Sequence, residues 1–212
     1  VEVTDDPFYA LVIGSDTRYG TVDGANLKET DPSYSDTMML VRVDPKNYRV
    51  SILSLPRDTV ISLDGRDEKL NESHYVYGIN GANGLIDQVE ALTGVRPEYY
   101  FETTFAKFED FIDALGGVTV NVPIDLQWSD VVHGGDDGEE LFVPAGDDQT
   151  LNGIDALIFS RVRKQYALEG EANRQVNARQ VVQSGISFVA SRPTSEAAVY
   201  AAVLEKACDT NM

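Results

Sequence analysis

The sequence predicts an α/β fold, in the form of a three-layer α/β/α sandwich around a central mixed β-sheet. Apolar strands alternate along the chain with segments of helical periodicity, and no internal repeat interrupts that order. With 212 residues, of which 42% are hydrophobic, the chain is expected to form a single domain, residues 1–212, with one sizeable core. Strands this uniformly apolar are typical of central strands that helices cover on both faces.

The expected strands share β-branched and aromatic residues and end at turn-forming residues. They are residues 8–14, 37–43, 49–55, 99–103 and 118–122. Gly14 ends the first of them, and Pro56 ends the third. The last one alternates between apolar and polar residues and is closed by Pro123.

The expected helices show apolar residues three and four positions apart. They are residues 84–93, 105–115, 152–158, 173–191 and 195–207. Gly94 is the stop of the first helix, and Thr150 or Asn152 can cap the third. The inward stripes are Leu85, Ile86, Val89 and Leu92, then Phe105, Phe108, Ile112 and Leu115, and in the long helix Val181, Val182, Ile186 and Val189. The acidic, glycine-rich residues 125–149 are expected to form a surface hairpin or excursion.

The chain is strongly acidic, with a formal net charge of −18. Nucleic-acid binding relies on basic surfaces, so this composition argues against a nucleic-acid partner and against adsorption to anionic lipid. No apolar run is long enough to span a membrane, and the opening without methionine predicts that the sequence is a piece of a longer protein. Cys208, the single cysteine, cannot form an internal disulfide. His74 and His133 lack the spacing of zinc ligands.

Two arginines, Arg161 and Arg163, are separated by one residue in the word SRVR. In an extended segment they project from the same side, and two planar guanidinium groups side by side match a diphosphate. On spacing alone, surface salt bridges with the abundant acids explain the pair slightly better. Arg174 favours the ligand interpretation, because it is expected to open the helix at 173 and helix N-termini attract anions.

Asp16, Asp36 and Arg57 each flank a predicted strand, and ligands of such sheets bind where strands end. Mg²⁺ prefers oxygen ligands, and one or two carboxylates together with phosphate oxygens suffice to hold it. Asp16 and Asp36 are therefore the candidate metal ligands. Turn or capping roles explain either carboxylate singly, and a local pairing with Asp58 explains Arg57 singly.

Six short words occur in a fixed order: GSDTR from Gly14, SDTMML from Ser35, SLPRDT from Ser54, KLN from Lys69, SRVR from Ser160 and EANR from Glu171. With them, residues 8–189 resemble the LytR-CpsA-Psr (LCP) family of bacterial cell-wall proteins. The resemblance implies a phosphotransferase domain at the extracellular face of the cytoplasmic membrane, tethered there by an N-terminal membrane helix that precedes the given sequence. It implies a polyprenyl-pyrophosphate-linked glycan as donor, a peptidoglycan sugar hydroxyl as acceptor and Mg²⁺ as cofactor, in the attachment of teichoic acid or capsular polysaccharide.

The resemblance also implies roles for individual residues. Asp16 and Asp36 would hold Mg²⁺, and the catalytic set would be Asp16, Asp36, Arg57, Arg161 and Arg163. The pyrophosphate would be bound by Arg18, Arg57, Lys69, Asn71, Arg161, Arg163 and Arg174.

The sequence departs from the family pattern near its long helix. Glu171 stands where the family usually has Asp, and Asn177 and Ala178 stand where it usually has Arg and Gln. Arg179 and Gln180 could fill those roles only after a register shift of two residues, which would rotate them by about 200°. The missing glutamine leaves one alternative open, a polyprenyl-phosphate-binding protein that transfers nothing. A second alternative, a pyrophosphatase that uses water as acceptor, is permitted by the same set of residues.

Overall fold

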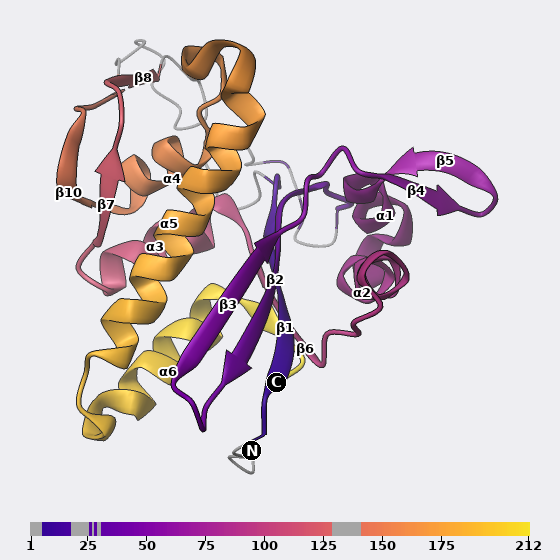
Figure 1. Ribbon diagram of the computed structural model, residues 1–212, viewed down its shortest axis with the longest axis horizontal. Coiled ribbons are helices and arrows are strands. Elements are labelled where there is room, and N and C mark those ends of the chain that lie inside the picture. Colours follow the sequence, from indigo (N-terminus) through magenta and orange to yellow (C-terminus); the bar gives the residue numbers. More distant parts are fainter. Residues whose placement is uncertain (1–5, 18–25, 27, 29–30, 129–140) are drawn as a thin grey trace. The chain divides into compact units, whose positions relative to one another are not determined.

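The structure is a computed structural model that describes residues 6–17, 26, 28, 31–128 and 141–212. Its internal contacts divide the chain into two compact units (Figure 1). The first unit takes its described residues from 6–17, 26–104 and 208–212, and the second takes them from 105–207. The assignment of the whole chain to one domain stays a prediction.

The first unit contains a five-stranded mixed sheet in the order β11-β6-β1-β2-β3. Its strands are β1 (Phe8–Ser15), β2 (Ser35–Asp44), β3 (Arg49–Ser54), β6 (Tyr99–Thr103) and β11 (Asp209–Thr210). β1 pairs antiparallel with β2 and parallel with β6, which makes the sheet mixed. The prediction of an α/β chain with a central mixed sheet is therefore confirmed.

A β-bulge interrupts the pairing of β1 with β2 at the end of β1. Gly14 lies opposite Thr37 and Ser15 lies opposite Ser35, so Asp36 has no residue opposite it. A bulge adds one residue to one strand and changes the direction in which its side chains point. In this sheet the extra residue is one of the two predicted metal ligands.

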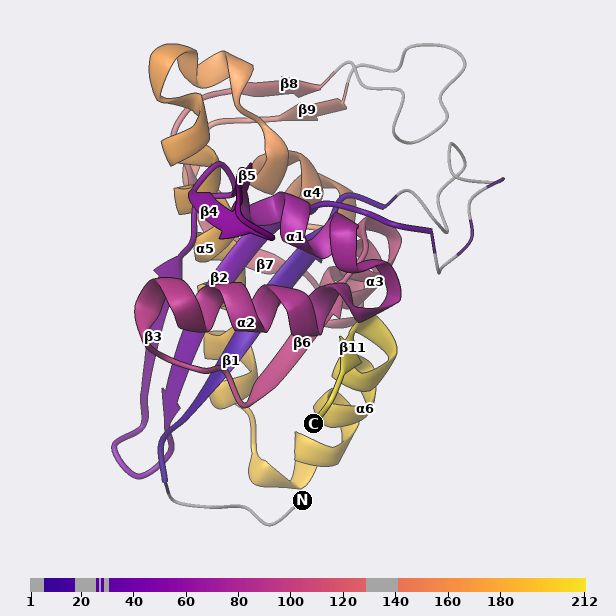
Figure 2. The same ribbon diagram turned by 90° about the vertical axis from the view of Figure 1, so that its right-hand side faces the viewer.

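Two helices, α1 (Leu70–Tyr77) and α2 (Gly81–Thr93), lie side by side over one face of this sheet (Figures 1 and 2). The core beneath them combines Leu11, Ile13 and Met38 from the strands with Leu85 and Val89 from α2. The stripe predicted for α2 is correct except at its end, where Leu92 is exposed. Helix α2 ends at Gly94, whose φ of 73° is a left-handed conformation that glycine adopts without strain.

Four features of the first unit differ from expectation. Helix α1 and the hairpin of β4 (Val60–Leu63) with β5 (Arg66–Lys69) were not predicted, because residues 60–80 are mostly polar and show no clear period. The short strand β11 was also missed, and Cys208 lies directly before it. β3 is an edge strand, not a central one, and its Val50 and Leu53 are exposed.

The second unit combines helices with short antiparallel strand pairs. Its helices are α3 (Phe105–Ala114), α4 (Gly153–Arg161), α5 (Gly170–Ala190) and α6 (Ala197–Ala207), with short 3₁₀ turns η3 (Lys164–Glu169) and η4 (Thr194–Glu196). Its strands are β7 (Val118–Val122), β8 (Leu126–Trp128), β9 (Leu141–Val143) and β10 (Gly146–Leu151). β7 pairs with β10, and β8 pairs with β9. The hairpin expected within 125–149 is thus present in its described part.

The core of the second unit lies among α3, α4, α5 and β7, where Ile112, Val118, Phe159 and Val181 are buried. Asn152 caps α4 as predicted, since its side chain accepts a hydrogen bond from the backbone N–H of Asp155 at 2.9 Å. The stripe predicted for the long helix fades toward its C-terminal end. Val182 and Ile186 are half-buried and Val189 is exposed.

Candidate functional site

Asp16 and Asp36 lie at the end of the first unit's sheet where β1 ends and β2 begins. The backbone N–H of Tyr34 donates to Oδ1 of Asp16 at 2.7 Å, and the backbone N–H of Asp16 donates to the carbonyl of Tyr34 at 2.9 Å. Burial raises the pKa of Asp16 above its ordinary value, and the negative charge of Asp36 raises it further. The two carboxylates are thus close enough to repel each other, an arrangement that a divalent cation would stabilise.

Arg57 follows β3 and joins this pair. Its Nη1 donates to Oδ1 of Asp36 at 2.7 Å, and its Nε lies 3.7 Å from Oδ2 of Asp58. Asp58 also accepts from Nζ of Lys69 at 2.6 Å. The local Arg57–Asp58 pairing considered from the sequence is present, but the contact of Arg57 with Asp36 is the shorter one.

Asn71 connects to the same group through its backbone, whose N–H donates to the carbonyl of Arg57 at 3.2 Å. Its side chain is buried, and Oδ1 has no hydrogen-bond partner among the described residues. Leaving a buried acceptor unsatisfied is costly in free energy.

Five of the site residues predicted from the sequence are linked by these contacts and form one group, the carboxylate cluster. They are Asp16, Asp36, Arg57, Lys69 and Asn71.

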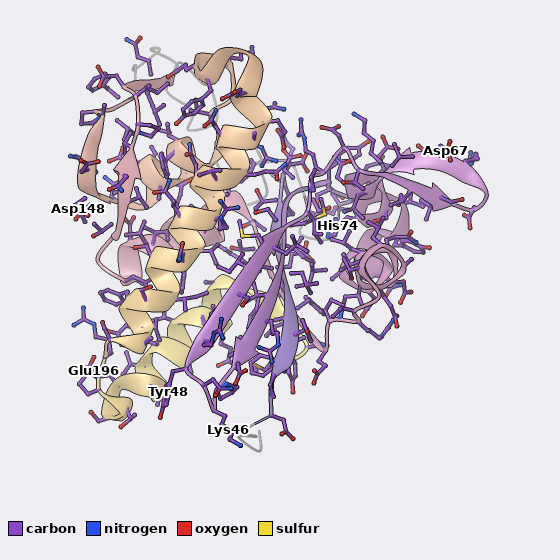
Figure 3. The ribbon with its side chains drawn as sticks, viewed as in Figure 1. Lys46, Tyr48, Asp67, His74, Asp148 and Glu196 are labelled. Carbon is purple, nitrogen blue, oxygen red and sulfur yellow. The ribbon has the colours of Figure 1, made fainter. Side chains whose placement is uncertain are left out.

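His74 lies near this cluster, although its spacing in the sequence did not predict a role in the site. His74 on α1 is buried between the helix and the sheet (Figure 3). Its Nδ1 lies 2.8 Å from the carbonyl oxygen of Ser33, and its Nε2 lies 3.0 Å from Oε1 of Glu102 on β6, at ion-pair distance though outside hydrogen-bond alignment. Its position three residues after the word KLN was the signal that could have pointed to it.

The charge of His74 is set by opposing effects. Burial lowers the pKa of His74, but Glu102, the Ser33 carbonyl and Asp16 together outweigh burial and raise the pKa above its ordinary value. Both ring nitrogens face oxygen atoms, and only the protonated ring can donate from both. The folded protein therefore favours the imidazolium form.

In the second unit, Arg161 is the last residue of α4, and Arg163 follows two positions later, after Val162. The expectation of an extended SRVR segment is wrong, because the helix continues through Arg161 and only Val162 has an extended backbone. The guanidinium of Arg161 lies over the ring of Phe105, 4.0 Å from its centroid. Nη1 of Arg163, which is about half exposed, lies 3.9 Å from Oε2 of Glu171.

Arg174 is buried and bound to Glu171 through two nitrogens, Nε at 3.1 Å and Nη2 at 2.5 Å. The sequence placed Arg174 at the start of the long helix, and this is wrong, because α5 begins at Gly170. Gly170 allows that earlier start, since a Cβ there would lie 2.4 Å from the carbonyl oxygen of Arg163. Glu171 thus faces both Arg163 and Arg174, and these three residues form the arginine cluster of the second unit.

The departures from the family pattern have structural roles. Asn177 is buried and donates to the carbonyl of Phe159 and to the hydroxyl of Tyr166, both at 2.9 Å. Ala178 is buried. Gln180 accepts from the backbone N–H of Asn121 on β7 at 3.2 Å, so the side chain that a shifted register would assign to the pyrophosphate is engaged with the neighbouring strand.

Some predictions fall outside what the structure describes. Arg18 and His133 are outside the described residues. Within the described ranges, no group of three or more His, Cys, Asp or Glu side chains could hold a metal ion. The two carboxylates of the carboxylate cluster still fit Mg²⁺, because this ion needs fewer protein ligands. It commonly takes one or two carboxylates and completes its coordination shell with phosphate oxygens and water. Within the same ranges, no helix is long and apolar enough to cross a membrane.

Comparison with known proteins agrees with the resemblance seen in the sequence. The model of the LytR_cpsA_psr family matches residues 1–212. The chain is 32% identical over 184 residues to the polyisoprenyl-teichoic acid–peptidoglycan teichoic acid transferase TagU of Bacillus subtilis (strain 168), a match that covers 86% of this chain and 52% of that protein. It is similarly 32% identical over 183 residues to the TagU of Halalkalibacterium halodurans, covering 85% of this chain and 53% of that protein.

Solved structures give the same result. The crystal structure of B. subtilis TagV is similar with a TM-score of 0.79 and 25% identity, over 99% of this chain and 75% of that one. The crystal structure of B. subtilis TagU is similar with a TM-score of 0.63 and 29% identity, over 98% of this chain and 77% of that one. The chain belongs to the LytR-CpsA-Psr family and has its α/β fold. It spans about half the length of the curated relatives named above.

Proposed function

We propose that this chain is the catalytic domain of a cell-wall glycopolymer transferase. It would move a glycopolymer phosphate from a polyprenyl-pyrophosphate carrier to a sugar hydroxyl of peptidoglycan, at the extracellular face of the membrane. Membership of the family and the names of the transferases it resembles support the reaction class. The observation that carries the proposal is the carboxylate cluster, in which Asp16, Asp36 and Arg57 lie together where three strands begin or end.

The two carboxylates are the proposed ligands of Mg²⁺. Bound there, the ion would supply positive charge to the diphosphate oxygens. Arg57 would lie beside the same oxygens, because it already contacts Asp36. The repulsion that raises the pKa of Asp16 is the property a divalent cation would relieve.

The arginines of the second unit are proposed to bind the same substrate. Arg161 and Arg163 are partly or largely exposed at the end of α4, and each could offer a planar pair of N–H donors to a phosphate. Arg174 is buried, and its hydrogen bonds with Glu171 fix the orientation of its guanidinium, so little side-chain freedom would be lost when it binds a phosphate. Lys69, already paired with Asp58, is assigned to the substrate as a further cation.

The proposed reaction is a phosphoryl transfer, in which one bond to phosphorus forms and another breaks. The acceptor hydroxyl oxygen forms a bond to the sugar-linked phosphorus, the bond from that phosphorus to the bridging oxygen breaks, and the polyprenyl monophosphate leaves while the hydroxyl proton passes to a base. Catalysis of this kind rests on neutralising the oxygens of the diphosphate and placing the hydroxyl in line.

A direct assay tests the proposal. The protein is incubated with a polyprenyl-pyrophosphate-linked glycan, a peptidoglycan oligomer and Mg²⁺, and products are separated by mass spectrometry. A glycan–phosphate–peptidoglycan conjugate together with polyprenyl monophosphate is the expected result. Polyprenyl monophosphate and free glycan phosphate without conjugate would instead identify a pyrophosphatase. Saturable donor binding without turnover would identify a lipid-binding protein.

A further inference from the structure

Helix α1 contacts two consecutive residues of the segment that leads into β2. His74 binds the carbonyl of Ser33 through Nδ1 at 2.8 Å. The ring of Tyr75 stacks on the ring of Tyr34, with centroids 4.8 Å apart and an angle of 9° between the ring planes. Two neighbouring helix residues thus hold two neighbouring residues of an otherwise irregular segment.

The same segment binds Asp16 and delivers Asp36. Tyr34 exchanges two backbone hydrogen bonds with Asp16, one of them to the carboxylate. Ser35 then starts β2, and Asp36 follows at the bulge. A displacement of residues 33 and 34 would therefore move both carboxylates.

His74 is itself fixed from two sides. Glu102 on the central part of the sheet lies 3.0 Å from Nε2, on the ring edge opposite Ser33. On α2, a Cβ at Gly81 would lie 2.7 Å from the His74 carbonyl oxygen and 2.9 Å from two ring atoms. Only glycine at position 81 leaves this room, so the two helices pack in a way that admits the imidazole and holds it in one orientation.

We propose that His74 is a positioning residue for the two carboxylates: held by Glu102, it fixes residues 33 and 34 so that Asp16 and Asp36 present their oxygens at one spacing. The inference rests on the proposed function, since it gives the carboxylate spacing a catalytic meaning. Residues that orient metal ligands from behind typically change affinity or activity about 10- to 100-fold when removed. A misplacement of reacting groups by about 1 Å can lower the rate about 100-fold.

The test compares His74→Ala with Val89→Ala, a core variant of α2 chosen to lose comparable stability in the same unit. Three quantities are measured: the ¹³Cγ NMR signal of Asp16, which is assigned by its loss in Asp16→Asn; the affinity for Mn²⁺ as a probe cation; and kcat and KM for glycan transfer. For His74→Ala we expect a shifted Asp16 signal, Mn²⁺ binding weakened about 10- to 100-fold and a similar fall in kcat. Val89→Ala should change none of these.

Two further variants keep the test decisive. Glu102→Gln leaves the imidazole in place and removes the carboxylate behind it, so a smaller change of the same kind is expected even if His74→Ala does not fold. His74→Gln retains an N–H donor for Ser33 and should recover part of the Mn²⁺ affinity. An Asp16 signal and a Mn²⁺ affinity that stay unchanged in folded His74→Ala and in Glu102→Gln would overturn the inference. If wild-type protein transfers no glycan, the proposed function fails, while the Asp16 signal still decides the positioning role.

Discussion

Arg57 donates from Nη1 to Oδ1 of Asp36 at 2.7 Å, so an arginine three positions beyond the end of β3 and the bulged residue of β2 form one ion pair. Both side chains are partly exposed, with 20% of the arginine and 29% of the aspartate accessible. An exposed ion pair contributes little to stability by itself. Its main role is therefore to orient the two side chains, and it places Arg57, a proposed substrate-binding cation, beside the carboxylates.

Asp36→Asn should lower glycan transfer by about 100-fold or more and weaken its dependence on Mg²⁺, because it removes a proposed metal ligand and the partner of Arg57. Initial rates over a series of Mg²⁺ concentrations provide the measurement. Asp67→Asn is the control, since Asp67 is an exposed carboxylate on β5 of the same unit (Figure 3). An Asp36→Asn protein with the Mg²⁺ dependence of wild type would remove the metal assignment.

Arg161→Ala should reduce kcat/KM by about 100-fold or more, since a fixed cation beside the diphosphate is lost. Arg192→Ala is a closely matched control. Its guanidinium lies over Phe188 at 4.1 Å, as that of Arg161 lies over Phe105 at 4.0 Å, so both variants lose the same kind of ring contact. Equal activity of the two variants would show that Arg161 does not serve the substrate.

The ion pair of His74 with Glu102 should make stability depend on pH. The pKa of His74 is raised in the folded protein, so the stabilisation is fully present below the unfolded value near 6.5 and is lost as the pH rises through the higher folded pKa. The groups that face the ring are Glu102, the Ser33 carbonyl and the more distant Asp16. Glu102→Gln should therefore destabilise the protein more at pH 5.5 than at pH 8.5, as measured by urea unfolding. A loss of unfolding free energy that is the same at both pH values would contradict the positive charge assigned to His74.

Gly170→Ala should destabilise the protein, because its Cβ would lie 2.4 Å from the backbone carbonyl of Arg163. Relief of that clash must shift the backbone of Arg163 or the first turn of α5, which carries Glu171. Gly185→Ala in the same helix meets only Leu115 at 3.8 Å, so it should stabilise by about 0.5–1 kcal/mol through helix propensity. Thermal unfolding of both variants tests the opposite signs, and destabilisation by Gly185→Ala would show that the packing of α5 is misjudged.

Much of the fold could be predicted because its period was visible in the sequence. β6 occupies the predicted residues 99–103, and β7 occupies 118–122, since each is a short apolar run between clear breakers. The edge position of β3 was not visible, because an apolar run of this length does not reveal how many neighbours a strand has. The start of α5 was placed three residues late, because Gly170 signals a stop in sequence but here permits a close backbone approach.

The candidate site, too, could be predicted only in part. Asp16, Asp36 and Arg57 could be found from their places beside apolar strands, because strand ends gather side chains in space. The bulge that presents Asp36 could not be found, since it depends on the register between β1 and β2. The role of Glu102 could not be found either. Its partner, His74, lies 28 positions earlier in the chain and reaches it only because α1 packs on the sheet.

Binding of a short polyprenyl diphosphate in the presence of Mg²⁺ tests the central claim most directly, namely that the carboxylate cluster of the first unit and the arginines of the second serve one pyrophosphate. Calorimetric titration would compare wild type with Arg57→Ala, Arg163→Ala and the double variant, with the polyprenyl monophosphate as reference ligand. We predict that each single variant weakens diphosphate binding by about tenfold or more and that the diphosphate preference over the monophosphate falls in both. Wild-type affinity in either single variant would contradict the account.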